Sequence, residues 1–311
     1  MRVAFVGKGG SGKTTMSALF ARYVAGQGSP VVAVDADINQ HLALVLGLDT
    51  QPEPLGARLT EIKDLLRGDN PRIPSAAAMV KTTPPGRGSR LLTFEDLPYS
   101  VATPEGPRLM VTGPFGEEDL GVACYHSKVG AVELLLNHLV DEAGEYVVVD
   151  MTAGADSFAS GLFTRFDLTV LVAEPTRQGV SVYRQYRDYA ADFEVPIAVV
   201  GNKVQDPGDV EFLREHVGDD LLTWMEHSPA VRALEQGRPF ELTDLETGNL
   251  DALAVLLKQL DAQPKDWARF GRQTAEFHLR NARAWANERT GLDLATQIDP
   301  AFVYGPAALA Q

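Results

Sequence analysis

The chain has 311 residues, of which 45% are hydrophobic and 23% charged, and its formal net charge at pH 7 is −14. This acidic excess argues against nonspecific binding to nucleic acid or to anionic membranes, because lysine and arginine supply that attraction. A membrane span needs about 18 consecutive apolar residues, and no apolar run in the sequence is close to that length. The single cysteine, Cys124, permits no intrachain disulfide and fits a reducing compartment. We therefore expect a cytoplasmic protein that binds neither nucleic acid nor membrane.

Short valine-rich runs alternate with amphipathic stretches over most of the chain. The runs cover residues 2–6, 31–34, 146–150, 168–173 and 197–202. Strands that are apolar on both faces and alternate with helices are typical of a parallel sheet covered by helices on each side. The pattern predicts a doubly wound α/β fold with a mostly parallel sheet.

Two regions depart from this alternation. Residues 68–108 are rich in Pro, Gly and Ser and predict an irregular insertion, with a short hairpin formed by 90–94 and 99–103. After residue 240 the strands stop, and residues 251–260 and 265–288 predict helices. The second of these helices either packs back on the domain or docks a partner. The last residues, 293–311, predict an extended or partly disordered tail.

A glycine-rich loop follows the first predicted strand and precedes a predicted helix. It reads Gly7-Lys8-Gly9-Gly10-Ser11-Gly12-Lys13-Thr14, followed by Thr15. Its glycines let backbone N–H groups point at an anion, and the helix N-terminus adds a partial positive charge. We expect Lys13 to bridge the β- and γ-phosphates of a nucleotide and the Thr14 hydroxyl to bind Mg²⁺.

Carboxylates follow two further strands, at the edge where parallel strands open a ligand crevice. Asp35 and Asp37 end the second apolar run, and Asp150 ends the run that begins at residue 146. Asp150 takes the position of a carboxylate that holds the Mg²⁺ shell, and Gly154 is placed to offer its N–H to the γ-phosphate.

The fifth apolar run ends at Asn202 and Lys203, where an amide can read the edge of a base. The guanine-reading pattern Asn-Lys-x-Asp fails here, because Gln205 stands in place of the aspartate. The sequence therefore favours ATP over GTP.

The loop resembles the deviant Walker A motif of the MinD/ParA-type P-loop ATPases, a family that includes the nitrogenase iron protein and the ATPase that matures carbon monoxide dehydrogenase. The resemblance covers residues 1–240 and is carried by KGGSGKTT, residues 8–15. It implies that Lys8 reaches across a homodimer to the ATP bound by the partner subunit, as an arginine finger does. It also implies that Asp37 orients or activates the attacking water, that Asp35 supports the metal shell, and that Asn202 contacts adenine beside Pro229.

Within this family the chain resembles the branch that handles metal centres. Residues 119–139 resemble the segment that carries a cluster-ligating cysteine in the iron protein and Cys-x-Cys in the carbon monoxide dehydrogenase ATPase, and here they hold Cys124-Tyr125-His126. Ser157 replaces the second cluster cysteine, so a four-thiolate Fe–S cluster is not available. In a two-fold dimer, Cys124 and His126 would offer a Cys2His2 set for Zn²⁺ or Ni²⁺. The alternative is a buried cysteine beside an exposed histidine.

These observations predict an ATPase domain at residues 1–240 and a helical extension with a tail at 241–311. The leading hypothesis is a Mg-dependent ATPase that dimerises with ATP and serves as an accessory factor for a client metalloenzyme. The alternative is a regulatory or positioning ATPase that binds partner proteins without a metal. A P-loop kinase or synthetase is a third possibility, in which Lys8 has no evident role.

Overall fold

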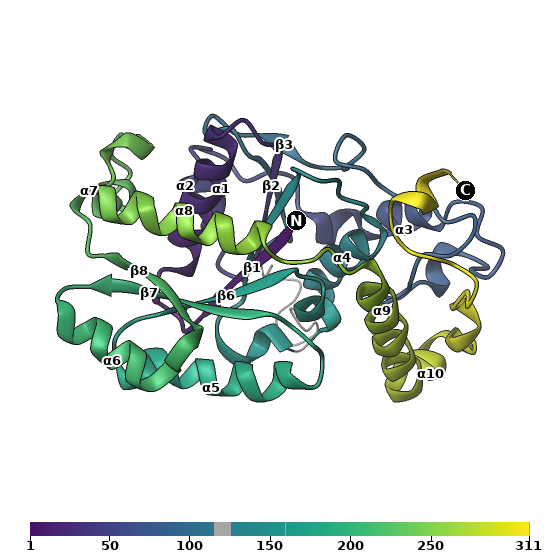
Figure 1. Cartoon of the computed structure of the whole chain (residues 1–311). Helices are drawn as coiled ribbons and strands as arrows, with labels where there is room; N and C mark the ends of the chain where they lie inside the picture. Colours follow the sequence, from purple (N-terminus) through teal and green to yellow (C-terminus); the bar gives the residue numbers. More distant parts are fainter. Residues whose placement is uncertain (115–125, 159, 311) are drawn as a thin grey trace.

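The fold is built on one twisted sheet whose strands run parallel except at one edge (Figure 1). The computed structural model describes residues 1–114, 126–158 and 160–310. The sheet has eight strands in the order β3-β4-β2-β5-β1-β6-β7-β8, and only β3 pairs antiparallel with its neighbour. The strands are β1 (Arg2–Gly7), β2 (Val31–Ala36), β3 (Val101–Ala102), β4 (Arg108–Val111), β5 (Tyr146–Met151), β6 (Leu168–Ala173), β7 (Ile197–Val204) and β8 (Leu221–Glu226).

Helices cover both faces of this sheet and continue beyond it (Figure 1). They are α1 (Lys13–Gly26), α2 (Leu42–Val45), α3 (Leu59–Arg67), α4 (His126–His138), α5 (Arg177–Ala191), α6 (Pro207–Val217), α7 (Pro229–Glu235), α8 (Thr247–Asp261), α9 (Trp267–Asn281) and α10 (Asn287–Thr290). The doubly wound α/β prediction is confirmed. In the part of the chain that the structure describes, no helix is long and apolar enough to cross a membrane.

Alternate residues of the central strands feed two separate cores, as the period of a strand requires. In β1, Ala4 and Val6 pack with α3, α4, α5 and α6, whereas Val3 and Phe5 pack with α1 and α8. Burial on both faces explains why these strands are continuous apolar runs in the sequence.

Two strands and one pairing differ from the sequence-based expectation. β4 and β8 were not predicted, because β4 is short and β8 is an edge strand whose residues are mostly half-buried. The predicted hairpin is wrong in its partners: Leu92 bridges Leu139 of the segment after α4, while β3 pairs with β4. The segment around residue 92 therefore lines the core beside α4 instead of folding back on itself.

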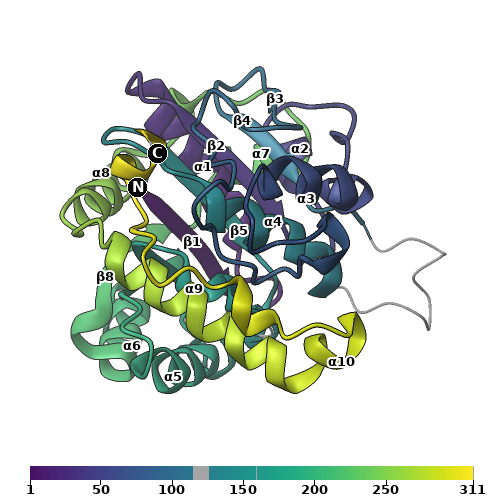
Figure 2. The same ribbon diagram turned by 90° about the vertical axis from the view of Figure 1, so that its right-hand side faces the viewer.

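The C-terminal region packs against the amino ends of the strands, and Figure 2 shows α9 and α10 running across that side of the molecule. The prediction of an extended tail is wrong for residues 293–310. Short helical turns cover Leu294–Gln297 and Pro306–Ala310, and between them Tyr304 is buried and donates a hydrogen bond to the Leu136 carbonyl at 3.2 Å.

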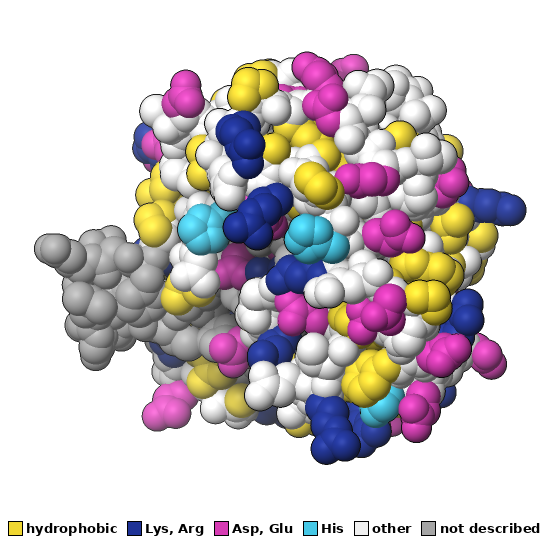
Figure 3. All heavy atoms as spheres, turned by 90° about the vertical axis from the view of Figure 1, so that its left-hand side faces the viewer, with side chains coloured by type: hydrophobic (Ala, Val, Ile, Leu, Met, Phe, Trp, Pro, Cys, Tyr) yellow, Lys and Arg dark blue, Asp and Glu magenta, His cyan; other side chains and the backbone are white. Residues whose placement is uncertain are grey.

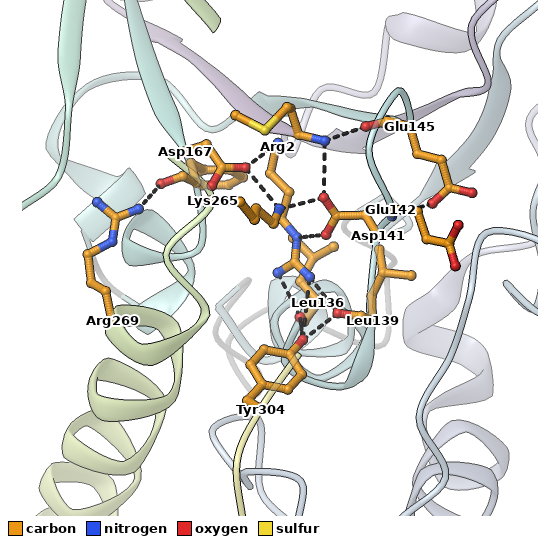
Figure 4. Close-up of polar contacts among 12 residues, drawn as sticks. Arg2, Leu136, Leu139, Asp141, Glu142, Glu145, Asp167, Lys265, Arg269 and Tyr304 are labelled. Carbon is orange, nitrogen blue, oxygen red and sulfur yellow. Dashed lines mark hydrogen bonds and ion pairs between the residues drawn. The ribbon is translucent and has the colours of Figure 1, made fainter. Parts of the chain in front are cut away.

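A buried ionic cluster joins this extension to the sheet (Figure 4). Lys265 pairs with Asp141 and lies 2.9 Å from Oδ2 of Asp167. The fully buried Arg2 guanidinium donates to Asp141 at 2.7 Å and to the Leu136 carbonyl at 2.9 Å. The cations hold the pKa of Asp141 well below its usual range even though burial acts to raise it. A buried carboxylate with this many partners ties α9 to β1 by charge as well as by packing.

Candidate functional site

The loop between β1 and α1 is shaped by a glycine at the first turn of the helix. Gly12 has φ +90°, a left-handed conformation, and a Cβ there would overlap Nδ2 of Asn202. The helix begins at the next residue, Lys13, and the turn before it is closed by a 3.1 Å hydrogen bond from the Ser11 N–H to the Lys8 carbonyl. Only glycine fits position 12 without moving the β7 residue that packs on it.

Residues predicted to contact the base also hold this loop from its outer side. Asn202 Nδ2 donates to the Ser11 carbonyl at 2.7 Å, and Lys203 Nζ donates to the Gly10 carbonyl at 2.7 Å. Lys203 also pairs with Glu174 at 2.5 Å. These bonds hold the Gly10 and Ser11 carbonyl groups in place and thereby fix the shape of the loop.

Lys13 lies at the centre of the site and is surrounded by carboxylates. Its Nζ is hydrogen-bonded to Asp37 and lies 3.6 Å from Oδ1 of Asp150. Burial acts to lower the pKa of Lys13, but Asp150 and Asp37 outweigh burial and raise it. Thr14 donates to Oδ2 of Asp150 at 2.6 Å. The predicted lysine, hydroxyl and two of the predicted carboxylates are thus in one place.

The two strand-end carboxylates at the base of the site are deeply buried and lie side by side. Asp35 and Asp150 are register partners in β2 and β5, and neither is exposed. Burial, together with the charge of Asp150, raises the pKa of Asp35 to about 7. Burial also raises the pKa of Asp150 to about 6, although Lys13 and Thr14 oppose the rise. The site therefore contains more buried acid than its one lysine neutralises.

Asp35 uses both carboxylate oxygens within its own segment. Oδ1 accepts from the Asp37 N–H at 3.1 Å and Oδ2 accepts from the Leu42 N–H at 2.9 Å. Asp35 thereby shapes the turn that carries Asp37 and starts α2. Oδ1 of Asp150, in contrast, is buried and accepts no hydrogen bond.

Two adjoining cavities surround the loop at the carboxyl edge of the sheet. One, of about 340 Å³, is lined by Gly9, Gly10, Gly12, Lys13, Thr14, Asp37, Asn39, Gln40, His41, Ala153 and Glu235. The other, of about 290 Å³, is lined by Gly12, Thr15, Met16, Leu19, Asn202, Lys203, Met225, Glu226, His227, Ser228, Val231, Arg232 and Glu235. Figure 3 looks toward the left-hand side of Figure 1, where acidic, basic and histidine side chains gather around a recessed area. The first cavity is lined mainly by polar side chains and loop glycines, and the second combines polar side chains with the apolar Met16, Leu19, Met225 and Val231.

Several of these residues gave no signal in the sequence. Glu235 of α7 borders both cavities and accepts a hydrogen bond from Thr15 at 3.1 Å. Met225 lies in β8, which was not predicted, whereas His227 follows that strand and belongs with Pro229 to the segment that the family resemblance places near adenine. His227 therefore joins His41 as a histidine beside the site.

The other predicted site residues lie around these cavities. Gly7 ends β1, Gly154 begins a short helical turn after β5 with φ +67°, and Pro229 is the first residue of α7. Lys8 points to Gln178 of α5, with Nζ 2.8 Å from Oε1. The proposed metal pair falls outside what can be described: Cys124 is not among the described residues, and neither is the His126 side chain. Within the described residues, no group of three or more His, Cys, Asp or Glu side chains is placed to hold a metal.

Comparison with known families agrees with this geometry. The model of the CobQ/CobB/MinD/ParA nucleotide binding domain matches residues 3–240. The chain belongs to this family. Its nucleotide-binding domain thus comprises the loop, the carboxylates and both cavities.

Relatives of this family domain are similar in sequence over most of their length. The carbon monoxide dehydrogenase accessory protein CooC of Rhodospirillum rubrum is 27% identical over 242 residues, which is 76% of this chain and 87% of that protein. An uncharacterized ATP-binding protein of Methanocaldococcus jannaschii is 29% identical over 223 residues, 71% of this chain and 81% of its own.

Solved structures of the MinD/ParA group share the fold. A ParA family ATPase from Chlorobium tepidum superposes with a TM-score of 0.58 at 16% identity, covering 82% of this chain and 98% of its own. MinD of Pyrococcus horikoshii, solved with Mg-ADP, gives a TM-score of 0.57 at 16% identity, covering 84% and 96%. The predicted MinD/ParA fold is confirmed.

Proposed function

We propose that this chain is a Mg-dependent ATPase that closes as a homodimer around ATP and serves as an accessory factor for a client metalloenzyme. The observation that carries the ATPase proposal is the contact of Lys13 with Asp37 and Asp150 inside the cavity that the phosphate loop borders. A buried lysine paired with two carboxylates exchanges them readily for a triphosphate, which offers it more negative charge.

In this proposal the two cavities divide the nucleotide between them. The triphosphate lies against the loop and Lys13, and adenine enters between Met16, Met225 and Val231 in the second cavity. When Lys13 turns to the phosphates, Asp37 is released and is free to orient the attacking water.

The residues present fit a magnesium ion. Thr14 and Asp150 would hold it, since Asp150 keeps a buried oxygen without a hydrogen bond and Mg²⁺ commonly uses one or two protein ligands beside phosphate oxygens. The bound ion would supply charge neutralisation to the phosphate oxygens. Asp35 would support the site indirectly, because its carboxylate accepts hydrogen bonds from the N–H groups of residues 37 and 42 and so positions Asp37.

The client role rests on similarity to CooC, an accessory protein of carbon monoxide dehydrogenase. Similarity over 87% of that protein supports an accessory ATPase more directly than it supports a particular client. Lys8, half-buried in the loop and hydrogen-bonded to Gln178, is the residue that we assign to the partner's nucleotide.

Hydrolysis and assembly test this proposal together. We expect phosphate release from Mg-ATP, little from Mg-GTP, and none after Lys13→Ala, whereas Lys258→Ala on the exposed face of α8 keeps the rate. Sedimentation should show a dimer with ATP.

Metal content of wild type and of a Cys124→Ser/His126→Ala variant, both without a histidine tag, then separates a metal-handling factor from a positioning ATPase. A Lys13→Ala protein that still hydrolyses ATP would contradict the assignment.

A further inference from the structure

A third cavity lies away from the nucleotide site, where the extension meets α3 and α4. It has a volume of about 390 Å³ and is lined by Leu59, Lys63, Ala77, Met79, Val80, Lys81, Gly130, Trp285, Arg289 and Thr290. None of these residues borders the two cavities of the nucleotide site. Figure 2 shows the side of the molecule on which α3, α4 and α10 lie.

The lining carries three cations and no carboxylate. Among the described residues, neither Lys63 nor Lys81 nor Arg289 forms a salt bridge. The fully buried Glu133 interacts electrostatically with Lys81, but Arg165 affects Glu133 more strongly. Burial, followed by the charge of Arg289, lowers the pKa of Lys63. These three cations, none of which forms a salt bridge within the described residues, line one cavity of a chain whose net charge is −14, and they make a local positive field that favours an anion.

The remaining walls are apolar and include one aromatic ring. Met79 and Val80 are buried, and Trp285 is half-buried with its Nε1 donating to Asn281 at 2.9 Å. The Arg289 guanidinium lies 5.7 Å from the centre of the Trp285 ring. Trp285 belongs to a π-helical turn at Ala282–Ala286 between α9 and α10, a deviation that is frequent at functional sites. The turn directs Trp285 and Arg289 into the same cavity.

We propose that this cavity binds a small amphipathic organic anion, with its flat apolar body on Trp285, Met79 and Val80 and its acidic group among Lys63, Lys81 and Arg289. The volume suits a ligand of this size, and an apolar lining with a few convergent charged groups is the usual composition of such sites. The inference goes beyond the nucleotide-dependent function and stands without it.

The probe for this site is 8-anilino-1-naphthalenesulfonate, an aromatic anion. We expect one saturable site per chain that excess Mg-ATP does not displace. A Lys63→Gln/Arg289→Gln variant should bind about tenfold more weakly or worse. The matched control, Lys258→Gln on α8, should bind as wild type does. The uncharged analogue N-phenyl-1-naphthylamine should be insensitive to the same substitutions.

Energy transfer from tryptophan to the probe locates it. Trp285→Phe should remove most of the transfer, and Trp224→Phe in β8 should leave it. Thermal melts of each variant show whether it is folded. Displacement by Mg-ATP, equal affinity in the Lys63→Gln/Arg289→Gln variant, or transfer that survives Trp285→Phe would each overturn the proposal. None of these outcomes bears on ATP hydrolysis, so the two proposals fail separately.

Discussion

Lys8 donates from Nζ to Oε1 of Gln178 across 2.8 Å, so the loop's first lysine is directed away from Lys13 and toward the start of α5. The two lysines thus have separate surroundings in one subunit. Lys13 is buried among carboxylates, whereas Lys8 is half-buried beside the Gln178 amide. This separation is what the proposed roles require, with Lys13 serving the nucleotide of its own subunit and Lys8 serving that of the partner.

Replacing Lys8 should uncouple nucleotide binding from hydrolysis. We expect Lys8→Ala to bind ATP within about twofold of wild type and to lose about a thousandfold in turnover, as loss of a finger residue does. Titration calorimetry and phosphate release measure the two quantities. Gln178→Ala, which frees Lys8, should keep turnover. A Lys8→Ala enzyme with normal turnover would show that this lysine serves no partner site.

A methyl group at Gly12 should break the nucleotide site locally. Gly12→Ala adds a Cβ that overlaps Asn202 and forces alanine to φ +90°. We expect ATP affinity to fall at least about a hundredfold and the free energy of unfolding to fall by about 2 kcal/mol. Gly248→Ala in α8 is the matched control, since its Cβ meets no atom and φ is not positive. The control should be neutral or slightly stabilising, because alanine favours a helix more than glycine does. A Gly12→Ala protein that keeps wild-type stability and ATP affinity would show that neither the Asn202 contact nor the left-handed backbone restricts position 12.

The buried carboxylates predict an unusual pH dependence of stability. Burial raises the folded-state pKa of Asp150 to about 6 from the ordinary aspartate value of 3.8, so the folded protein holds a proton more tightly than the unfolded chain does. The stability that this proton contributes is therefore lost as pH rises from about 4 to about 6. Asp150→Asn removes that loss. We expect its free energy of unfolding, relative to wild type without nucleotide, to rise by about 2 kcal/mol between pH 4 and pH 7.

Urea unfolding of both proteins at each pH measures this difference, and the comparison cancels the opposite effect of His138, whose pKa burial lowers to about 4. A difference that stays constant with pH would mean that Asp150 is charged at no cost in the folded protein.

The ionic cluster at the amino ends of the strands should hold the extension in place. Lys265→Met leaves Asp141 and Asp167 with fewer cations in a buried setting, and we expect a loss of about 3 kcal/mol in the free energy of unfolding. Arg272→Met in α9, the helix that begins two residues after Lys265, breaks only the exposed 3.5 Å pair with Glu194 and should cost about 0.5 kcal/mol or less. Limited proteolysis of the extension reports whether the Lys265→Met loss is local. Equal effects of the two substitutions would argue that packing alone docks α9.

The sequence by itself determined the sheet centre, the phosphate loop and the strand-end acids, because these depend on local patterns. An apolar run buried on both faces marks a central strand, so the sequence placed Asp35 and Asp150 at the carboxyl edge of a parallel sheet. The strand order, which makes β2 and β5 neighbours and Asp35 and Asp150 register partners, came from the structure.

Only the tertiary structure decided which distant side chains complete the site. Glu235 reaches Thr15 across 220 positions, and Gln178 reaches Lys8 across 170. Tyr304 is a further example: it lies in the C-terminal segment, and its hydroxyl donates a hydrogen bond to the Leu136 carbonyl near the end of α4. Such contacts follow from how helices pack on the sheet, and no local periodicity encodes a single polar contact between segments so far apart.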